Sequence, residues 1–247
     1  MSFKPQKWRR VVRYGNSKHG EVEEYFSTRR GNGKIPNRSK NVGETPWDVA
    51  IINELNSEDN LRWILNGNFK AGDLHIALTY IKGARPPVAE SKKYVQQFLK
   101  EMRKYYKTLE KPLKYIWTTE VGVKGAIHHH MILEYIDIRI IKEFWRYGKI
   151  QILGILDNTG RYDALAAYII KETAKTFCSA NPPHKKRYNT SQNLVKPKID
   201  YKKLKPKRWL KQPKSNKQYA IVPGTVMEGI HGRTGKPWRF YKVVFLE

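Results

Sequence analysis

The stretch KYIWTTEVGVKGAIHHHMIL, residues 114–133, decides the fold that this sequence predicts. Apolar and β-branched residues run along both of its arms, and Gly122 and Gly125 mark a turn between them. Two such runs joined by a short glycine-containing turn are typical of a β-hairpin. We therefore expect two antiparallel strands with the turn centred on Lys124.

This register brings three potential metal ligands together. Glu120 lies opposite His128, and opposed residues on paired strands are about 4.5–5.5 Å apart at Cβ. Because side chains alternate between the two faces of a strand, His130 shares the face of His128, whereas His129 points to the other face. Two imidazoles and one carboxylate within reach of one divalent cation predict a three-ligand metal site with room for substrate or water.

Other interpretations of the three histidines stay open. Histidines on a strand are often ordinary core or surface residues, and a ligand pair that includes His129 is an alternative to His128 with His130. Non-haem iron oxygenases also use two histidines and a carboxylate. That class usually presents a His-x-Asp/Glu pair with a distant second histidine, so the His-x-His spacing disfavours it.

The composition indicates a polyanionic partner. The chain has 247 residues, of which 48 are Lys or Arg and 22 are Asp or Glu, for a formal net charge of +26. Such a charge favours binding to nucleic acid through its phosphates. A hydrophobic content of 40% is enough for a sizeable core, and an aromatic content of 12% is high for a histone-like packing protein.

Other signals concern the compartment and exclude some functions. Cys178 is the only cysteine, which excludes an internal disulfide and a cysteine-based zinc module and suits a reducing cytoplasm. The chain lacks an apolar run of about 18 residues and a signal-peptide core, so we expect a soluble, intracellular protein with no membrane partner. No segment matches a P-loop, so we expect no fused ATPase or helicase.

The rest of the central region alternates between helices and strands. A helix is expected from Thr45 to a break near Asn66, and the strand LHIALTY follows at 74–80. The further expected elements are helices over 91–109, 137–145 and 160–177 and a strand over 149–157. This order predicts an α+β fold with a central antiparallel sheet of about five strands and helices packed on it.

Two basic segments flank this region. Residues 1–45 are interpreted as a partly ordered arm that touches nucleic acid through Arg29 and Arg30, with a solubilising tail as the alternative. Residues 178–217 mix cations with aromatic residues, a pattern that suits phosphates and stacked bases, with a flexible linker as the alternative. The candidate DNA-binding residues of that second segment are Lys185, Lys186, Arg187, Lys207, Arg208 and Trp209. The C-terminal stretches QYAIVPGTV and WRFYKVVFLE show strand alternation and are expected to fold back onto the body.

The helix expected over 160–177 offers a nucleophile. Tyr168, Lys171 and Lys175 fall at i, i+3 and i+7 and share one face of it, apart from the apolar face. Two ammonium groups favour the phenolate form of a tyrosine and can hold the phosphate that it attacks, and Lys175 is also a candidate DNA contact. Tyr162 lies about 120° away around the helix, which makes it a poor second nucleophile.

These motifs resemble those of the HUH endonuclease superfamily. IHHHMIL at 127–133 is similar to its His-hydrophobe-His motif, YIIK at 168–171 to its tyrosine motif, and LHIALTY to the first motif of rolling-circle replication initiators. Glu120 matches the third ligand of initiators from circular single-stranded DNA viruses. The order and spacing most resemble the replication-associated proteins of filamentous phages and related bacterial elements, over about residues 20–180.

The resemblance implies a rolling-circle replication initiator with an RRM- or ferredoxin-like HUH fold. Tyr168 would attack a phosphate of single-stranded origin DNA, giving a 5′-phosphotyrosine and a free 3′-hydroxyl, while Lys171 positions phosphate or metal. Glu120, His128 and His130 would bind Mg²⁺ or Mn²⁺. The implied partners are an origin hairpin and a host helicase and polymerase acting in trans, in the cytoplasm of a bacterial host.

The implied division of the chain has three parts. A basic arm and helix occupy 1–72, the nuclease core occupies 73–178, and a basic proline-rich segment with strands packing on the core occupies 179–247. A one-tyrosine HUH transposase or a relaxase is the nearest alternative, although relaxases usually place the tyrosine before the histidine motif. A non-catalytic nucleic-acid-binding protein is the alternative from another class, because the +26 charge alone would suffice for it.

Overall fold

The computed structural model describes residues 6–27, 47–157, 162–179, 186–205, 212–231 and 235–246. The chain forms two compact units. We call Ile51–Val195 the core unit, and Met1–Ala50 together with Lys196–Glu247 the terminal unit.

The core unit is built on a β-α-β-β-α-β sequence of elements. These are β3 (Leu74–Thr79), α2 (Val88–Thr108), β4 (Tyr115–Val121), β5 (Ile127–Leu133), α3 (Ile138–Phe144) and β6 (Ile150–Ile155), followed by α4 (Asp163–Phe177) and β7 (Asn189–Thr190). The five strands pair in the order β6-β3-β5-β4-β7, and every pairing is antiparallel. This is the ferredoxin-like arrangement, so the predicted fold class is confirmed.

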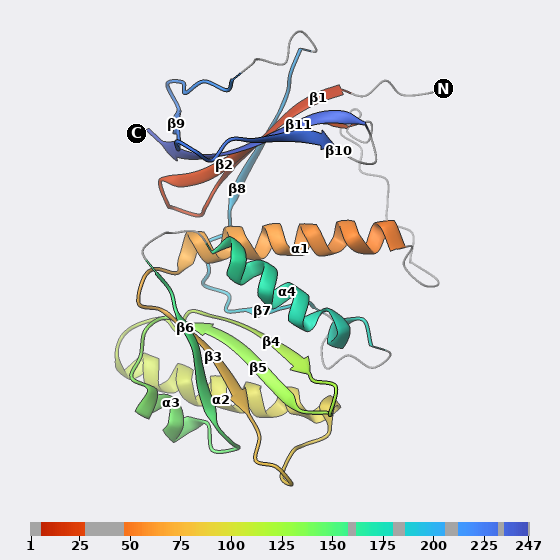
Figure 1. Ribbon diagram of the computed structural model, residues 1–247. Coiled ribbons are helices and arrows are strands. Elements are labelled where there is room, and N and C mark those ends of the chain that lie inside the picture. Colours follow the sequence, from red (N-terminus) through yellow and green to blue (C-terminus); the bar gives the residue numbers. More distant parts are fainter. Residues whose placement is uncertain are drawn as a thin grey trace. The chain divides into compact units, whose positions relative to one another are not determined.

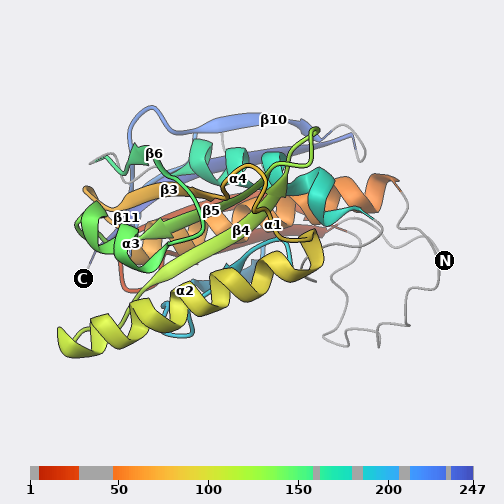
Figure 2. The ribbon, with the colours of Figure 1, turned by 90° about the horizontal axis from the view of Figure 1, so that it is seen from below.

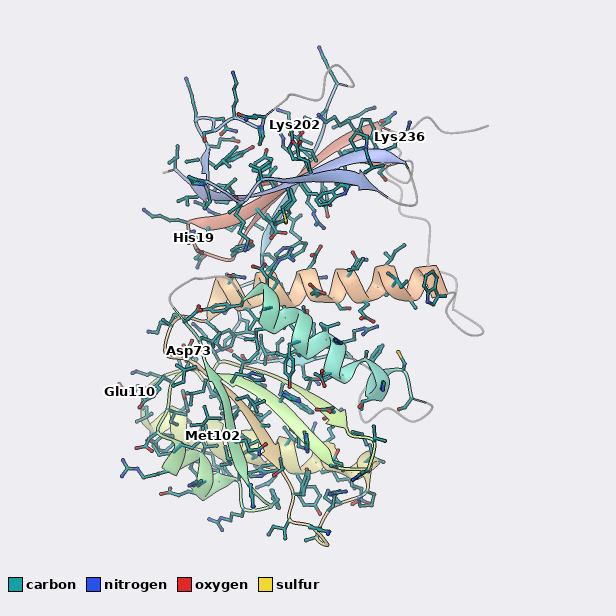
Figure 3. All side chains as sticks on the ribbon, viewed as in Figure 1. His19, Asp73, Met102, Glu110, Lys202 and Lys236 are labelled. Carbon is teal, nitrogen blue, oxygen red and sulfur yellow. The ribbon has the colours of Figure 1, made fainter. Side chains whose placement is uncertain are left out.

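Helices cover both faces of this sheet (Figure 1, Figure 2). On one face α2 and α3 pack on alternate residues of the strands, and Met102, which is labelled in Figure 3, is fully buried in this cluster. On the other face α4 and the C-terminal half of α1 (Trp47–Asn68) pack on Ile116 and Ile132. The second face therefore carries the even-numbered residues of β4 and β5.

The hairpin has the register that the sequence predicts. Glu120 pairs with His128, and the strand pairing continues to Tyr115 opposite Leu133. The amide of Gly125, whose φ is +71°, donates to the carbonyl of Gly122 at 2.8 Å. A residue in the left-handed region favours glycine, so this position accounts for the turn.

Gly148, just before β6, is a point where the backbone tolerates no side chain. A Cβ there would lie 2.0 Å from the carbonyl oxygen of Thr79 and 2.6 Å from Cα of Tyr80. We expect Gly148→Ala to lower the free energy of unfolding by about 1–3 kcal/mol or more, because both obstacles are backbone atoms. Gly154→Ala in β6 is the matched control, since its Cβ would meet nothing within 4 Å. Denaturant unfolding of the two variants tests this expectation, and equal stabilities would contradict it.

The terminal unit contains a second antiparallel sheet. Its strands are β1 (Gln6–Arg13), β2 (His19–Ser27), β8 (Lys198–Lys203), β9 (Tyr219–Ile221), β10 (Met227–His231) and β11 (Lys236–Phe245). They pair in the order β10-β11-β2-β1-β8, with β9 also on β11. A small apolar cluster of Val22, Tyr219, Tyr241 and Val243 lies on one face.

This sheet corrects the interpretation of both ends of the chain. The sequence pattern was interpreted as a partly ordered arm over residues 1–45, but residues 6–27 form a regular hairpin. A flexible linker was the alternative for the basic segment 178–217, and it is wrong for residues 198–203, which form an edge strand on β1. The C-terminal strands are confirmed as strands, and they belong to this second sheet: β11 pairs with β2, and β9 and β10 pair with β11. None of the helices in the described residues has the length and apolar character needed to span a bilayer.

The hairpin 6–27 was not predicted as two strands because buried charged residues interrupt its apolar alternation. The Glu24 carboxylate accepts from Arg9 at 2.6 and 2.9 Å and lies 3.2 Å from Lys7 Nζ. Burial alone would raise the pKa of Glu24, but the hydrogen bond and charge of Arg9, with Lys7, outweigh it and lower that pKa.

Glu24 should therefore make the stability of the terminal unit depend on acid. The pKa is depressed in the folded state, so the stabilisation is present above the unfolded value near 4.5 and is lost as pH falls through the folded value. We expect Glu24→Gln to cost about 3–5 kcal/mol at neutral pH, because the buried Lys7 and the partly buried Arg9 lose their partner. Glu23→Gln, which removes a half-buried pair with Arg10, should cost about 1 kcal/mol or less. Unfolding curves recorded from neutral to acid pH would contradict the account if the difference between wild type and Glu24→Gln stayed constant.

Candidate active site

Three polar side chains of the hairpin meet on the α4 face of the central sheet. The Oε2 atom of Glu120 lies 3.0 Å from Nε2 of His130 and 3.7 Å from Nδ1 of His128. The side chain of His130 is only 3% exposed, against 20% for Glu120 and 37% for His128. The carboxylate thus joins a buried imidazole to an open one, as the strand register requires.

Helix α4 brings Tyr168 to the same place. Ala166, Ile169 and Ile170 are buried against the sheet and leave Tyr168 42% exposed. Near the helix end, the amide of Val121 donates to the Thr176 hydroxyl at 2.7 Å, which fixes α4 to β4. The ring of Tyr168 lies edge-on to the His130 ring with 5.8 Å between centroids. The structure therefore brings the predicted nucleophile and the predicted ligands together.

The electrostatics of Tyr168 differ from the expectation. Partial burial, followed by the nearby carboxylates Glu172 and Glu120, raises the pKa of Tyr168 above its usual value. The lowering of this pKa expected from two lysines is wrong, because burial and the charges of Glu172 and Glu120 all favour the protonated phenol. In the chain alone, Tyr168 is a protonated phenol.

Lys171 and Lys175 are exposed on α4. Within the described parts of the chain, neither forms a hydrogen bond or a salt bridge. Their ammonium groups are thus available to an incoming anion on the side of the helix that carries Tyr168.

His129 lies on the opposite face of β5 and is fully buried. Its Nδ1 is hydrogen bonded to the Thr119 hydroxyl at 2.9 Å and its Nε2 to the Tyr80 hydroxyl at 2.8 Å. Both nitrogens are thus engaged within the α2 side of the sheet. This position leaves His129 outside the ligand set and accounts for a polar residue in the middle of the triplet.

His129 should therefore matter for stability rather than for chemistry. His129→Leu removes the partner of the buried Thr119 hydroxyl, at about 1–3 kcal/mol for an unsatisfied group, while the Tyr80 hydroxyl still donates to the carbonyl of Ser91. We expect a clear fall in the melting temperature, whereas His128→Leu, at a 37% exposed side chain, should change the free energy of unfolding by about 0.5 kcal/mol or less. Thermal unfolding of both variants checks this, and equal losses would contradict it.

His75 on β3 belongs to the site and was not singled out from the sequence. Its ring lies 5.6 Å from that of His130 and 6.0 Å from that of Tyr168, centroid to centroid. Burial, and then the charge of His130, lowers the pKa of His75 to about 4, so it is neutral at pH 7. The alternation of LHIALT, with Leu74, Ile76 and Leu78 on the α2 face, was the signal that places His75 on the other face.

The donor set has the chemistry of a divalent-cation site. In the residues that the structure describes, no three imidazole, thiol or carboxylate groups already surround one point as a complete ligand set. However, Nδ1 of His130 and Nε2 of His75 are buried without a hydrogen-bond partner, which is a common sign of a missing ion or water. Carboxylate suits Mg²⁺ and Mn²⁺, and imidazole favours a transition ion. The residues therefore fit Mn²⁺, and less closely Mg²⁺, after small side-chain movements around Glu120.

The candidate DNA-binding residues divide into two groups. Arg29, Arg30, Lys185, Lys207, Arg208 and Trp209 lie outside the described residues. Lys186 is exposed, whereas the side chain of Arg187 is only 9% exposed. The Arg187 guanidinium lies 4.8 Å from the centre of the Phe177 ring and 3.8 Å from a carboxylate oxygen of Glu54. Arg187 thus packs inside the core unit.

The central part of the chain is similar to a known protein family. Residues 73–177 match the family model of the replication-associated protein ORF2. The match runs from the start of β3 to the end of α4 and includes His75, the hairpin ligands and Tyr168. It confirms the resemblance to rolling-circle replication initiators and supports a role in replication. No curated protein and no solved structure matched the chain.

Proposed function

Because residues 73–177 match the family of the replication-associated protein ORF2, we propose that this chain initiates rolling-circle replication by nicking and rejoining single-stranded DNA. The reaction depends on a divalent cation and passes through a 5′-phosphotyrosine on Tyr168. One observation carries the proposal. A half-exposed tyrosine on a helix lies edge-on to a buried histidine that is itself bound to a carboxylate.

The proposed chemistry follows from the groups in this site. The phenol oxygen of Tyr168 attacks a backbone phosphorus and loses its proton, the bond from phosphorus to the 3′ oxygen breaks, and that oxygen takes up a proton. Phosphate is thereby transferred to Tyr168 as a 5′-linked diester, and a 3′-hydroxyl is released. The reverse attack by a 3′-hydroxyl restores the DNA strand, so the energy of the broken bond is kept for joining.

A bound cation would offset the repulsion between the carboxylates near Tyr168 and the phosphate that Tyr168 attacks. Held by Glu120, His128 and His130, it would supply positive charge next to the phosphate oxygens. The chain alone places Glu120 and Glu172 near Tyr168, and both repel an approaching phosphate as well as the phenolate. Lys171 and Lys175 offset that repulsion from the exposed side of α4.

The same geometry indicates the substrate. Tyr168 is open to solvent, and the net charge of +26 favours a nucleic-acid strand. We propose single-stranded origin DNA as the substrate, presented as a hairpin or beside one. The released 3′-hydroxyl would prime a host polymerase, with a host helicase acting in trans in the bacterial cytoplasm.

Transfer of a labelled strand to the protein tests the proposal. Purified protein is incubated with Mn²⁺ and single-stranded oligonucleotides that tile the replicon carrying its gene, each labelled at the 5′ or at the 3′ end. We expect a species that survives denaturing electrophoresis and carries the 3′ label only, because the tyrosine retains the downstream fragment. Chelation of the cation should abolish it. DNA binding without any covalent species would instead favour the non-catalytic alternative.

A further inference from the structure

A groove of about 560 Å³ lies within the terminal unit, formed by β1, β8, residues 217–219 and the end of β11. We propose that this terminal groove binds a segment of single-stranded DNA, as a second DNA site separate from Tyr168. The inference goes beyond the proposed function because it depends on the terminal unit and not on the cleavage chemistry. Lys202, labelled in Figure 3, lies on the edge strand that forms one wall.

The groove is positively charged, which favours an anionic ligand. Its lining includes Arg9, Arg13, Lys202 and Lys217 against one acid, Asp200. Arg9 is neutralised by Glu24. Among the described residues, Arg13, Lys202 and Lys217 form no salt bridge with a carboxylate, and neither does Asp200.

The strand register concentrates these cations. Arg13 pairs with Lys198, and Arg9 pairs with Lys202, across β1 and β8. Like charges directly opposite each other on paired strands are destabilising. Because Glu24 neutralises Arg9, the cost falls mainly on the pair of Arg13 and Lys198, and a bound phosphate would relieve it.

Aromatic groups indicate a single strand rather than a duplex. Phe245 contributes to the lining, and the Arg13 guanidinium lies 4.6 Å from the centre of its ring. Flat guanidinium and ring surfaces stack on bases, and only an unpaired strand exposes its base faces. The volume lies within the range of about 300–1,000 Å³ that is typical of ligand pockets.

Protection of an exposed sheet edge is the simpler explanation for lysines on β8. It does not account for the other cations. Arg13 comes from β1, which is paired on both sides, and Lys217 comes from the segment before β9. Cations from three segments around one groove indicate a binding surface.

Anisotropy of a fluorescein-labelled oligothymidylate tests the proposal on the full chain. Measurements use the Tyr168→Phe background with a chelator present, so that neither cleavage nor failure of the proposed function affects them. We expect the additional pair Arg13→Gln and Lys202→Gln to weaken binding about 10-fold at low salt and to reduce the salt slope by about 1.4, since each lost phosphate contact on a single strand is worth about 0.7. Lys203→Gln is the matched control, because Lys203 is the next exposed lysine on β8 and its side chain points to the opposite face.

The outcomes separate the explanations. An equal loss for Lys203→Gln would show that only overall charge matters and would overturn the proposal. An equal loss for a duplex of matched length would overturn the assignment to single-stranded DNA. Photocrosslinking of an iodouracil-containing oligonucleotide gives a readout that needs no variant. We expect adducts on the peptide that contains Phe245, and adducts confined to the core unit would contradict the proposal.

Discussion

Replacing Tyr168 with phenylalanine should abolish the covalent protein–DNA species and slow strand cleavage by about 10⁴-fold or more, as expected when a covalent nucleophile is removed. The substitution deletes one oxygen and keeps the ring that lies beside His75 and His130. Affinity for the oligonucleotide should stay within about twofold, because phosphate contacts to Lys and Arg dominate binding. Cleavage is measured with end-labelled DNA and affinity by anisotropy.

Tyr162→Phe is the matched control for this prediction. Tyr162 precedes α4, is 5% exposed, and donates its hydroxyl to the carbonyl of Asp157. Its loss should reduce stability slightly and leave the covalent species in place. A covalent species that persists in Tyr168→Phe and vanishes in Tyr162→Phe would move the nucleophile and contradict the account.

Glu120→Gln should have the second-largest effect. The glutamine has nearly the same shape and can still accept a hydrogen bond from His130, but it lacks the charge that links His128 and His130. We expect cleavage to fall by about 10³-fold, since a catalytic cation contributes several kcal/mol and each 1.4 kcal/mol is tenfold in rate. Mn²⁺ affinity, measured by isothermal titration calorimetry, should fall in parallel.

The stability of Glu120→Gln distinguishes a ligand from a structural residue. Its melting temperature should match that of wild type, whereas His129→Leu should melt earlier and keep its Mn²⁺ affinity. We therefore expect Glu120→Gln to lose Mn²⁺ affinity but not stability, and His129→Leu to lose stability but not Mn²⁺ affinity. If Glu120→Gln bound Mn²⁺ normally, the carboxylate would not be a ligand.

The hairpin and its ligands could be predicted because their signals are local. Alternation along 115–121 and 127–133 and a glycine in the turn fix which residues face each other, and the structure has Glu120 opposite His128. The position of Tyr168 followed from the same logic on a helix. The spacing of residues in the sequence thus predicted both the ligands on the hairpin and the tyrosine on the helix.

What could not be predicted depends on distances between elements. The pKa of Tyr168 is raised because Glu172 and Glu120 are near it and the site is partly buried, and neither fact is visible in a helical pattern. His75 was missed because its importance arises only when β3 lies beside β5. In β1 and β2, the buried charges Lys7 and Glu24 interrupt the apolar alternation that normally reveals a strand.

Identification of the modified residue is the most direct test of the central claim. The protein is reacted with single-stranded DNA and Mn²⁺, digested with protease and nuclease, and the peptides are sequenced by mass spectrometry. The account predicts a 5′-linked nucleotide on Tyr168, within the peptide that covers α4, and none in the presence of chelator. A nucleotide on any other residue, or a reaction that proceeds without a divalent cation, would contradict it.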